Sequence, residues 1–208
     1  MDMDILRRRL TSDEINDLPL YHYTGPVLVI RSLNDWKQAL PDLQDENLLG
    51  FDTETRPSFR KGRRNAPALI QLATARSVYL VQLANLPFGA PVAEILANPS
   101  QVKAGVGIGD DMRDLARLHA FEPAGLVDLG GVARAHRLSS QGLRTLAANL
   151  FGWRISKGSQ CSNWSLKELT PRQIVYAATD AWIGRLIFLR IPSSRASLGR
   201  QADDGGAA

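Results

Sequence analysis

Cysteine is scarce in this chain of 208 residues, in which Cys161 is the only one. A single cysteine excludes a disulfide framework within the chain and a metal site built from several thiolates. Long apolar runs are also lacking, and the opening sequence MDMDILRRRL has no apolar core of the kind found in signal peptides. We therefore expect a soluble intracellular protein of the cytoplasm.

Hydrophobic residues make up 44% of the sequence, which is enough to bury the core of one α/β domain. Lys and Arg outnumber Asp and Glu, which gives a net charge of +4 and an isoelectric point of about 9.5. This balance is compatible with a nucleic-acid partner. A soluble protein that is merely basic would carry the same charge, so both interpretations stay open on charge alone.

The composition divides the chain into three parts. Residues 1–22 are expected to form an N-terminal arm, and residues 193–208, which end in ADDGGAA, a disordered tail. Between them, in residues 23–192, strands are expected at 26–31, 48–54, 68–73 and 77–83, with a helix capped by Ser32 after the first. The remainder is mostly helical, apart from short strand-like runs at 102–108 and 125–129. We predict an α/β domain with a mixed sheet flanked by helices.

Asp52 and Glu54 stand at the end of the apolar run LLGF, residues 48–51. Residues two apart on a strand project from the same face, so both carboxylates are expected to point the same way. Ligand sites in α/β sheets favour the carboxyl ends of strands. A solvent-facing Asp-x-Glu at a strand end would give the same local pattern.

A second group of acids, Asp110, Asp111 and Asp114, follows the glycine-rich run GVGIG. If a helix begins near residue 109, Asp111 shares an inward face with Leu115 and Leu118. Asp110 and Asp114 would then lie toward the polar side. Asp111 is therefore the expected metal ligand, and Asp110 is the alternative. The structural alternative is that all three are ordinary acids in the first turn of a helix. The glycine run does not match a dinucleotide fingerprint, because its third glycine comes one residue early.

The third segment predicts a helix that carries Tyr176 and Asp180. The sequence TPRQ, residues 170–173, supplies an N-cap, a proline at the first helical position and a glutamine at the third. Tyr176 and Asp180 are then one turn apart on the same face. A hydrogen bond that only ties the helix down is the structural alternative.

Four carboxylates and one phenol thus come from three distant segments. Carboxylates are the hard oxygen ligands that divalent cations require, and a pair of cations can hydrolyse a phosphodiester bond. Two Mg²⁺ or Mn²⁺ ions are expected, because zinc would normally recruit His or Cys. The residue types predict a nuclease that cuts with two metal ions.

These motifs resemble those of the DEDD superfamily of 3′-5′ exonucleases, in the ribonuclease D-like and Werner-helicase-like branch with tyrosine in its last motif. The resemblance is carried by FDTE at 51–54, KAGVGIGDD at 103–111, SNW at 162–164 and YAATD at 176–180. It extends from about residue 27 to 189, and its glycines also select Asp111. Val175 stands where the sister branch has histidine. The resemblance implies a ribonuclease H-like fold and the release of nucleoside 5′-monophosphates.

The resemblance also implies a role for each site residue. The metal ligands would be Asp52, Glu54, Asp111 and Asp180. Tyr176 would hydrogen-bond and orient the attacking water, since a phenol with a pKa of about 10 is a poor base.

Substrate contacts are expected on both sides of these motifs. The basic residues after the first motif would attract the phosphate backbone of a single-stranded 3′ end; they are Arg60, Lys61, Arg63 and Arg64. A solvated charged loop is the alternative. Candidates for the cleft wall are Lys157, Asn163 and Trp164, together with Leu69 and Gln71. Core packing is the alternative for Trp164, Leu69 and Gln71.

Two other functions use the same residues. A catalytically weak nucleic-acid-binding module on this fold would be expected to have lost a carboxylate, whereas all four are present. A structure-specific endonuclease is disfavoured by Tyr176 four residues before Asp180. Because the chemistry acts on phosphate and not on sugar, the expected partner is single-stranded RNA or DNA.

Overall fold

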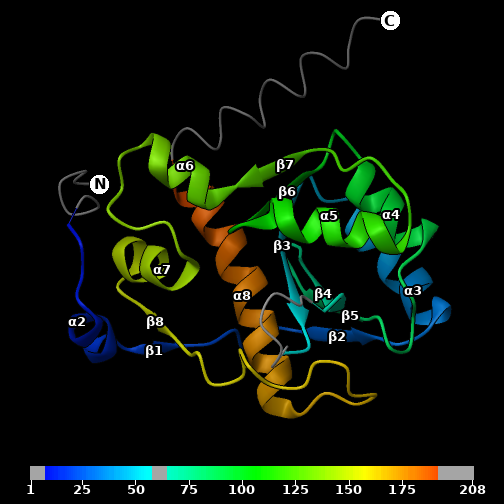
Figure 1. Ribbon diagram of the computed structural model, residues 1–208, viewed down its shortest axis with the longest axis horizontal. Helices are drawn as coiled ribbons and strands as arrows, with labels where there is room; N and C mark the ends of the chain where they lie inside the picture. Colours follow the sequence, from blue (N-terminus) through cyan, green and yellow to red (C-terminus); the bar gives the residue numbers. More distant parts are fainter. Residues whose placement is uncertain (1–7, 58–64, 192–208) are drawn as a thin grey trace, which may run out of the picture.

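The computed structural model describes residues 8–57 and 65–191 of the chain (Figure 1). The strands are β1 (Leu20–Tyr21), β2 (Val27–Ile30), β3 (Leu48–Thr55), β4 (Pro67–Ala73), β5 (Val78–Gln82), β6 (Val102–Gly105), β7 (Leu126–Asp128) and β8 (Arg154–Ile155). The helices are α2 (Ser12–Asp17), α3 (Leu33–Gln44), α4 (Ala90–Ala97), α5 (Ile108–Leu118), α6 (Leu129–Ala135), α7 (Leu143–Phe151) and α8 (Pro171–Arg190). Among these residues, no helix has the length and apolar character that crossing a membrane requires.

Six strands form one mixed sheet in the order β2-β5-β4-β3-β6-β7. Strands β3, β4 and β5 pair antiparallel, whereas β2 pairs with β5, and β6 with β3 and β7, in parallel. Every residue of β4, β5 and β6 is buried, as expected for strands covered on both faces. The predicted mixed α/β sheet is confirmed.

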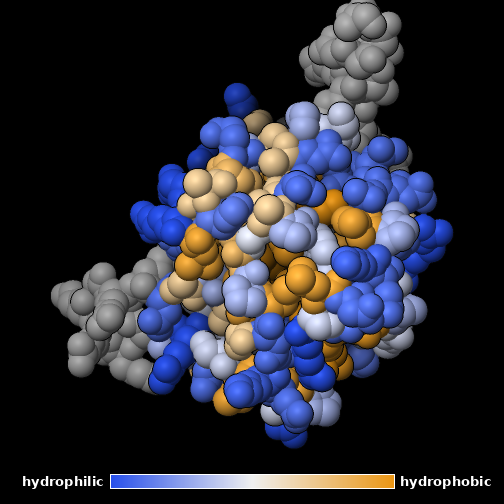
Figure 2. Space-filling view, turned by 90° about the vertical axis from the view of Figure 1, so that its right-hand side faces the viewer, coloured by the Kyte–Doolittle hydropathy of each residue, from blue (hydrophilic) through white to orange (hydrophobic). Residues whose placement is uncertain are grey.

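Helices cover both faces of the sheet and create two apolar layers. On one face, α3, α4 and α5 pack through residues such as Trp36, Val92 and Leu115. On the other face, α6, α7 and α8 pack through residues such as Leu146 and Ile183. Figure 1 shows α8 running through the centre of the molecule. Figure 2 views the side where α3 and α4 lie. Hydrophobic residues are exposed near the middle of this face and are surrounded by mostly hydrophilic ones.

Helix α8 begins where its sequence predicts. Thr170 is the N-cap, its side chain accepts the backbone N–H of Gln173, and the Gln173 side chain accepts the N–H of Thr170 in return. The helix then lies very close to β3: a Cβ added at Gly50 would stand 2.0 Å from the carbonyl oxygen of Ala181. Glycine on the strand and alanine on the helix are therefore what allow this approach.

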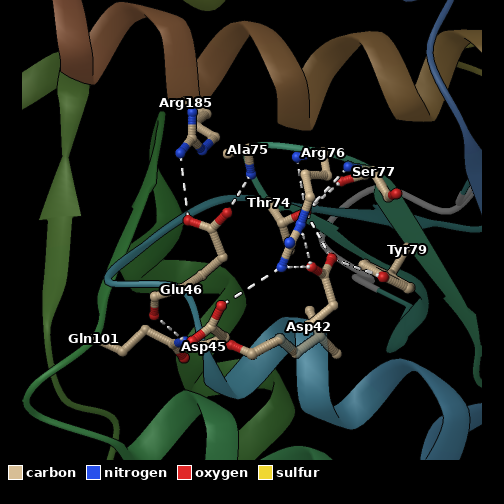
Figure 3. A network of polar contacts seen from close by, with 11 residues as sticks. Asp42, Asp45, Glu46, Thr74, Ala75, Arg76, Ser77, Tyr79, Gln101 and Arg185 are labelled. Atoms are coloured by element: carbon tan, nitrogen blue, oxygen red, sulfur yellow. Dashed lines mark hydrogen bonds and ion pairs between the residues drawn. The ribbon is translucent and has the colours of Figure 1, made fainter.

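A polar network anchors α8 at the end of β3 away from Asp52 and Glu54 (Figure 3). Arg185 of α8 forms an ion pair with Glu46, just before β3, with 3.3 Å between the Arg185 terminal nitrogen and Glu46 Oε2. Both side chains are largely buried, at 12% and 13% exposed. Glu46 also accepts the backbone N–H of Ala75 in the β4–β5 turn. One carboxylate thus ties the helix to two segments of the sheet.

Part of the expected N-terminal arm is ordered secondary structure. Residues 12–17 form α2, and residues 20–21 form β1, which pairs in parallel with β8. Tyr21 stacks on Trp153, with 4.1 Å between ring centroids. The domain boundaries at 22 and 193 remain predictions, and the expected tail lies outside the described residues.

Candidate active site

Asp52 and Glu54 lie on the face of β3 that α8 covers. Along β3 and β4 the residues alternate between the two faces, and Leu69 and Ala73 pack in the same apolar cluster as Ala177 and Ala181 of α8. Register pairs Glu54 with Leu69 and Gly50 with Ala73, which places the even-numbered residues of β3 on this face. Glu54 is buried and Asp52 is partly exposed. The expectation that both carboxylates share a face is confirmed.

Tyr176 and Asp180 project from α8 toward the same region. The phenol and the Asp180 carboxylate are close enough that each changes the pKa of the other. Asp180 is only 7% exposed, and Tyr176 is half-buried against Trp164, with 5.9 Å between ring centroids. The helix therefore brings a carboxylate and a phenol to the same place.

Asp111 reaches this group from the first turn of α5. The chain turns from β6 into α5 through Gly105 and Gly107: a Cβ at Gly105 would meet the carbonyl of Phe51 at 2.1 Å, and Gly107 has a φ of 73°. Asp111 raises the pKa of both Asp52 and Glu54 by coulombic repulsion. Asp110 is exposed and forms an ion pair with Arg113. The geometry therefore favours Asp111 over Asp110.

The sequence interpretation of α5 was wrong in two positions. Asp114 was expected on the polar side, but it is 8% exposed and forms an ion pair with Arg117. Leu118 was expected to face inward, but it is 46% exposed. The inward stripe of this helix is set by Ile108, Met112 and Leu115.

The electrostatics couple the acids from the three segments. Burial raises the pKa of Asp52 well above its ordinary value, and repulsion from Asp180 and Asp111 raises it further. Burial raises the pKa of Glu54 to about 9, together with repulsion from Asp52, Asp180 and Asp111. Burial raises the pKa of Asp180 to about 7, although the Tyr176 phenol acts in the opposite direction. A bound cation that offsets this negative charge would stabilise the cluster.

A cavity of about 460 Å³ opens beside these groups. Asp52, Glu54, Tyr176 and Asp180 all line it. Its other walls come from the start of α7, from α2 and from the segment after β8, and include Arg144, Thr145, Ser12, Ile15 and Lys157. A second cavity of about 560 Å³ shares Ser156, Tyr176 and Asp180 with the first.

Not all of the residues that were expected to contact the substrate line the cavity. Lys157 is exposed and lines the first cavity, where a cleft-wall residue was expected. Asn163 is exposed but lines neither cavity. Trp164 is fully buried, which matches its core-packing alternative, and Leu69 and Gln71 are buried as well. The four basic residues after the first motif, Arg60, Lys61, Arg63 and Arg64, lie outside the described residues.

Arg144 is a cavity residue that the sequence motifs did not identify. It stands in the first turn of α7, and its guanidinium donates to Asn16 of α2 at 2.6 Å. Its Nε is buried without a hydrogen-bond partner in the described parts of the chain. The packing of α7 against α8 and β8 brings this cation to the cavity that the carboxylates line, so no local signal could have found it.

The donor set suits hard divalent cations. All four acids offer oxygen, and the single cysteine, Cys161, is exposed. In the described residues, no three His, Cys, Asp or Glu side chains are gathered into a finished metal cluster. Repulsion among ionised carboxylates opposes their convergence in the metal-free protein, and a bound cation would offset that repulsion. The four acids therefore suit a divalent cation because they offer oxygen ligands and because their charges interact with one another.

The chain is similar in sequence to known 3′-5′ exonucleases. Residues 28–193 match the 3′-5′ exonuclease family. The chain is 31% identical over 186 residues to the bifunctional 3′-5′ exonuclease/ATP-dependent helicase WRN of Mus musculus, covering 85% of this chain and 13% of that protein. It is 31% identical over 170 residues to ribonuclease D of Gluconacetobacter diazotrophicus, covering 80% and 42%. The chain therefore spans less than half the length of either relative.

A solved structure supports the fold. The Nibbler exonuclease domain of Aedes aegypti superposes with a TM-score of 0.74 at 22% identity, covering 86% of this chain and 94% of that one. The expected ribonuclease H-like architecture and the resemblance to ribonuclease D and Werner-type exonucleases are both confirmed. By its matched residues and its fold, the chain belongs to the 3′-5′ exonuclease family.

Proposed function

We propose that this chain removes nucleotides from the 3′ end of single-stranded RNA or DNA and releases nucleoside 5′-monophosphates. The observation that carries the proposal is the electrostatic coupling of Asp52, Glu54, Asp111 and Asp180 beside one open cavity. Family membership supports the direction of attack. A binding module would not need four mutually repelling carboxylates, whose burial costs free energy unless they hold cations.

Two divalent ions, Mg²⁺ or Mn²⁺, would be held by Asp52, Glu54, Asp111 and Asp180. When bound, such ions lower the pKa of water and offset charge on the leaving oxygen. The protein's own contribution is orientation. Asp180 and Tyr176 lie one turn apart on α8, and Tyr176 packs against Trp164, so the phenol could hold the attacking water at a defined place.

Two cations that line the cavity would bind the substrate phosphates. Lys157 is exposed there, and Arg144, at the start of α7, also lines the cavity. Their charge would offset that of the nucleic-acid backbone, which contributes most of the affinity in nonspecific binding. Location in the cytoplasm, expected from the sequence, remains a prediction.

The test uses single-stranded RNA and DNA oligonucleotides labelled at the 5′ end. With Mn²⁺ or Mg²⁺, the protein should shorten them one nucleotide at a time, whereas excess EDTA should stop the reaction. A circular single strand of the same sequence should resist, because it has no 3′ end. Cleavage of the circle would indicate an endonuclease, and binding without any shortening would indicate a nucleic-acid-binding module.

A further inference from the structure

Gln71 is the direct cross-strand neighbour of Asp52. The two residues are paired in the antiparallel register of β3 and β4, and both side chains lie on the face that α8 covers. Gln71 is fully buried. Within the described parts of the chain, neither its Nε2 nor its Oε1 has a hydrogen-bond partner.

A buried amide without partners costs free energy, and packing does not require one here. The neighbours of Gln71 on the same face of β4 are Leu69 and Ala73, both fully buried and apolar. An apolar side chain of similar shape at position 71 would fill the same space without the cost. The amide therefore has a use that stability alone does not explain.

We propose that Gln71 is a positioning residue, which donates a hydrogen bond from Nε2 to the Asp52 carboxylate when that carboxylate binds a metal ion. The inference rests on the proposed function. Direct cross-strand neighbours have Cβ atoms about 4.5–5.5 Å apart, within reach of a glutamine amide. Asp52 Oδ1 already accepts the backbone N–H of Thr53 at 2.8 Å, and the carboxylate has further acceptor positions. Hydrogen bonds to a ligating carboxylate fix its orientation toward the ion.

Gln82 provides a matched comparison on the same face of the sheet. It is also fully buried, and register places it opposite Leu69 on β5. Its Nε2 donates to the carbonyl of Leu166 at 2.8 Å, and its Oε1 accepts from Arg31 Nε at 3.0 Å. The side-chain amide of Gln82 thus has hydrogen-bond partners for both its nitrogen and its oxygen. Within the described residues the amide of Gln71 has none, and it lies beside Asp52, a proposed metal ligand.

The experiment compares Gln71→Met and Gln82→Met with the unchanged protein. Thermal melting with EDTA measures the stability of the metal-free fold, and titration calorimetry with Mn²⁺ measures metal affinity. Gln71→Met should melt no lower than the unchanged protein but bind Mn²⁺ about 10–100-fold more weakly. Gln82→Met should melt lower and keep its Mn²⁺ affinity.

Each outcome decides something. A Gln71→Met protein that fails to fold or melts well below the unchanged protein would overturn the inference, because Gln71 would then be structural. An unchanged Mn²⁺ affinity in that variant would overturn it too. If the unchanged protein binds no Mn²⁺, while Asp52→Ala behaves identically in the titration, the proposed function itself fails and the inference falls with it.

Discussion

The phenol of Tyr176 and the carboxylate of Asp180 lie one turn apart on α8, close enough that each changes the pKa of the other. Burial raises the pKa of the phenol, and the charges of Asp180 and Glu54 raise it further. A phenol in this setting stays protonated at neutral pH. In the proposed mechanism Tyr176 would therefore orient the attacking water and would not remove its proton.

Tyr176→Phe tests this role. The variant should lose about 10²–10⁴-fold in kcat, because orientation of the water is lost while the carboxylates are unchanged. KM and Mn²⁺ affinity should stay within about threefold of the unchanged protein, a difference below 1 kcal/mol. Steady-state kinetics on a single-stranded oligonucleotide give both constants. A raised KM with normal kcat would instead assign Tyr176 to substrate binding.

Asp52→Ala should reduce hydrolysis to background while leaving the fold intact. The carboxylate is electrostatically opposed by Asp180 and Asp111, so its removal relieves repulsion in the metal-free protein. The melting temperature in EDTA should therefore equal or exceed that of the unchanged protein. Substantial remaining turnover would contradict the assignment of Asp52 as a ligand.

The metal-free fold should lose stability as pH rises from about 5 to 9. The pKa of Glu54 is raised from 4.5 to about 9 and that of Asp180 from 3.8 to about 7. A group whose pKa is higher in the folded state contributes stability that is complete below its unfolded pKa and lost as pH passes the folded pKa. Melting curves in EDTA across this range measure the loss.

Glu54→Gln is the control for that measurement. It should flatten the pH dependence most between pH 7 and 9, where Asp180 is already ionised. Saturating Mg²⁺ should flatten it as well, because the ion stabilises the ionised carboxylates, and its binding should release protons. An equal slope in the variant and the unchanged protein would show that other groups cause the effect.

The basic segment after β3 gives a prediction about salt. Changing Arg60, Lys61, Arg63 and Arg64 together to Ala should weaken single-strand binding and reduce the log–log salt slope by roughly 0.7 for each lost phosphate contact. Titrations at several salt concentrations, with Ca²⁺ in place of the catalytic ion, measure the slope. Exposed cations on α3 and α6, changed as Lys37→Ala and Arg134→Ala, are the control and should leave it unchanged. If both variants behave alike, the segment is an ordinary solvated surface.

Two glycines make a paired test of how closely α8 must lie on β3. Gly50→Ala places a methyl group 2.0 Å from the Ala181 carbonyl, so α8 must move away from the strand that carries Asp52. We expect lower stability by several kcal/mol, as for other overpacked core sites, and a lower kcat. Gly109→Ala, in α5, meets open space and should be neutral or stabilising by about 0.5–1 kcal/mol. Melting and kinetics on both variants separate packing from a general effect of losing glycine.

Local signals predicted much of this fold because they act over a few residues. The cap at Thr170 fixes the start of α8, and the apolar run before Asp52 fixes β3. On α5 the sequence predicted the wrong buried face. The buried apolar stripe begins at Ile108 and continues through Met112, which leaves Leu118 exposed. Periodicity gives a face only once its first residue is known.

Other parts of the site depend on contacts between segments far apart in the chain. Asn16 of α2 and Arg144 of α7 are 128 residues apart, and no local pattern encodes the hydrogen bond between them. The same holds for β1 and β8, which are two residues long and separated by more than a hundred positions. Apart from Lys157, the walls of the cavity were therefore not predictable from local sequence patterns, although its carboxylates were.

The position of α8 has a consequence for biosynthesis. Among the described elements this helix is the last to be made, and it brings Tyr176 and Asp180 to a site whose other acids come from β3 and α5. A growing chain that has not yet released residues 171–190 from the ribosome holds an incomplete ligand set. If these acids hold the metal ions as proposed, hydrolysis would therefore have to wait until α8 has been made and has packed on the sheet.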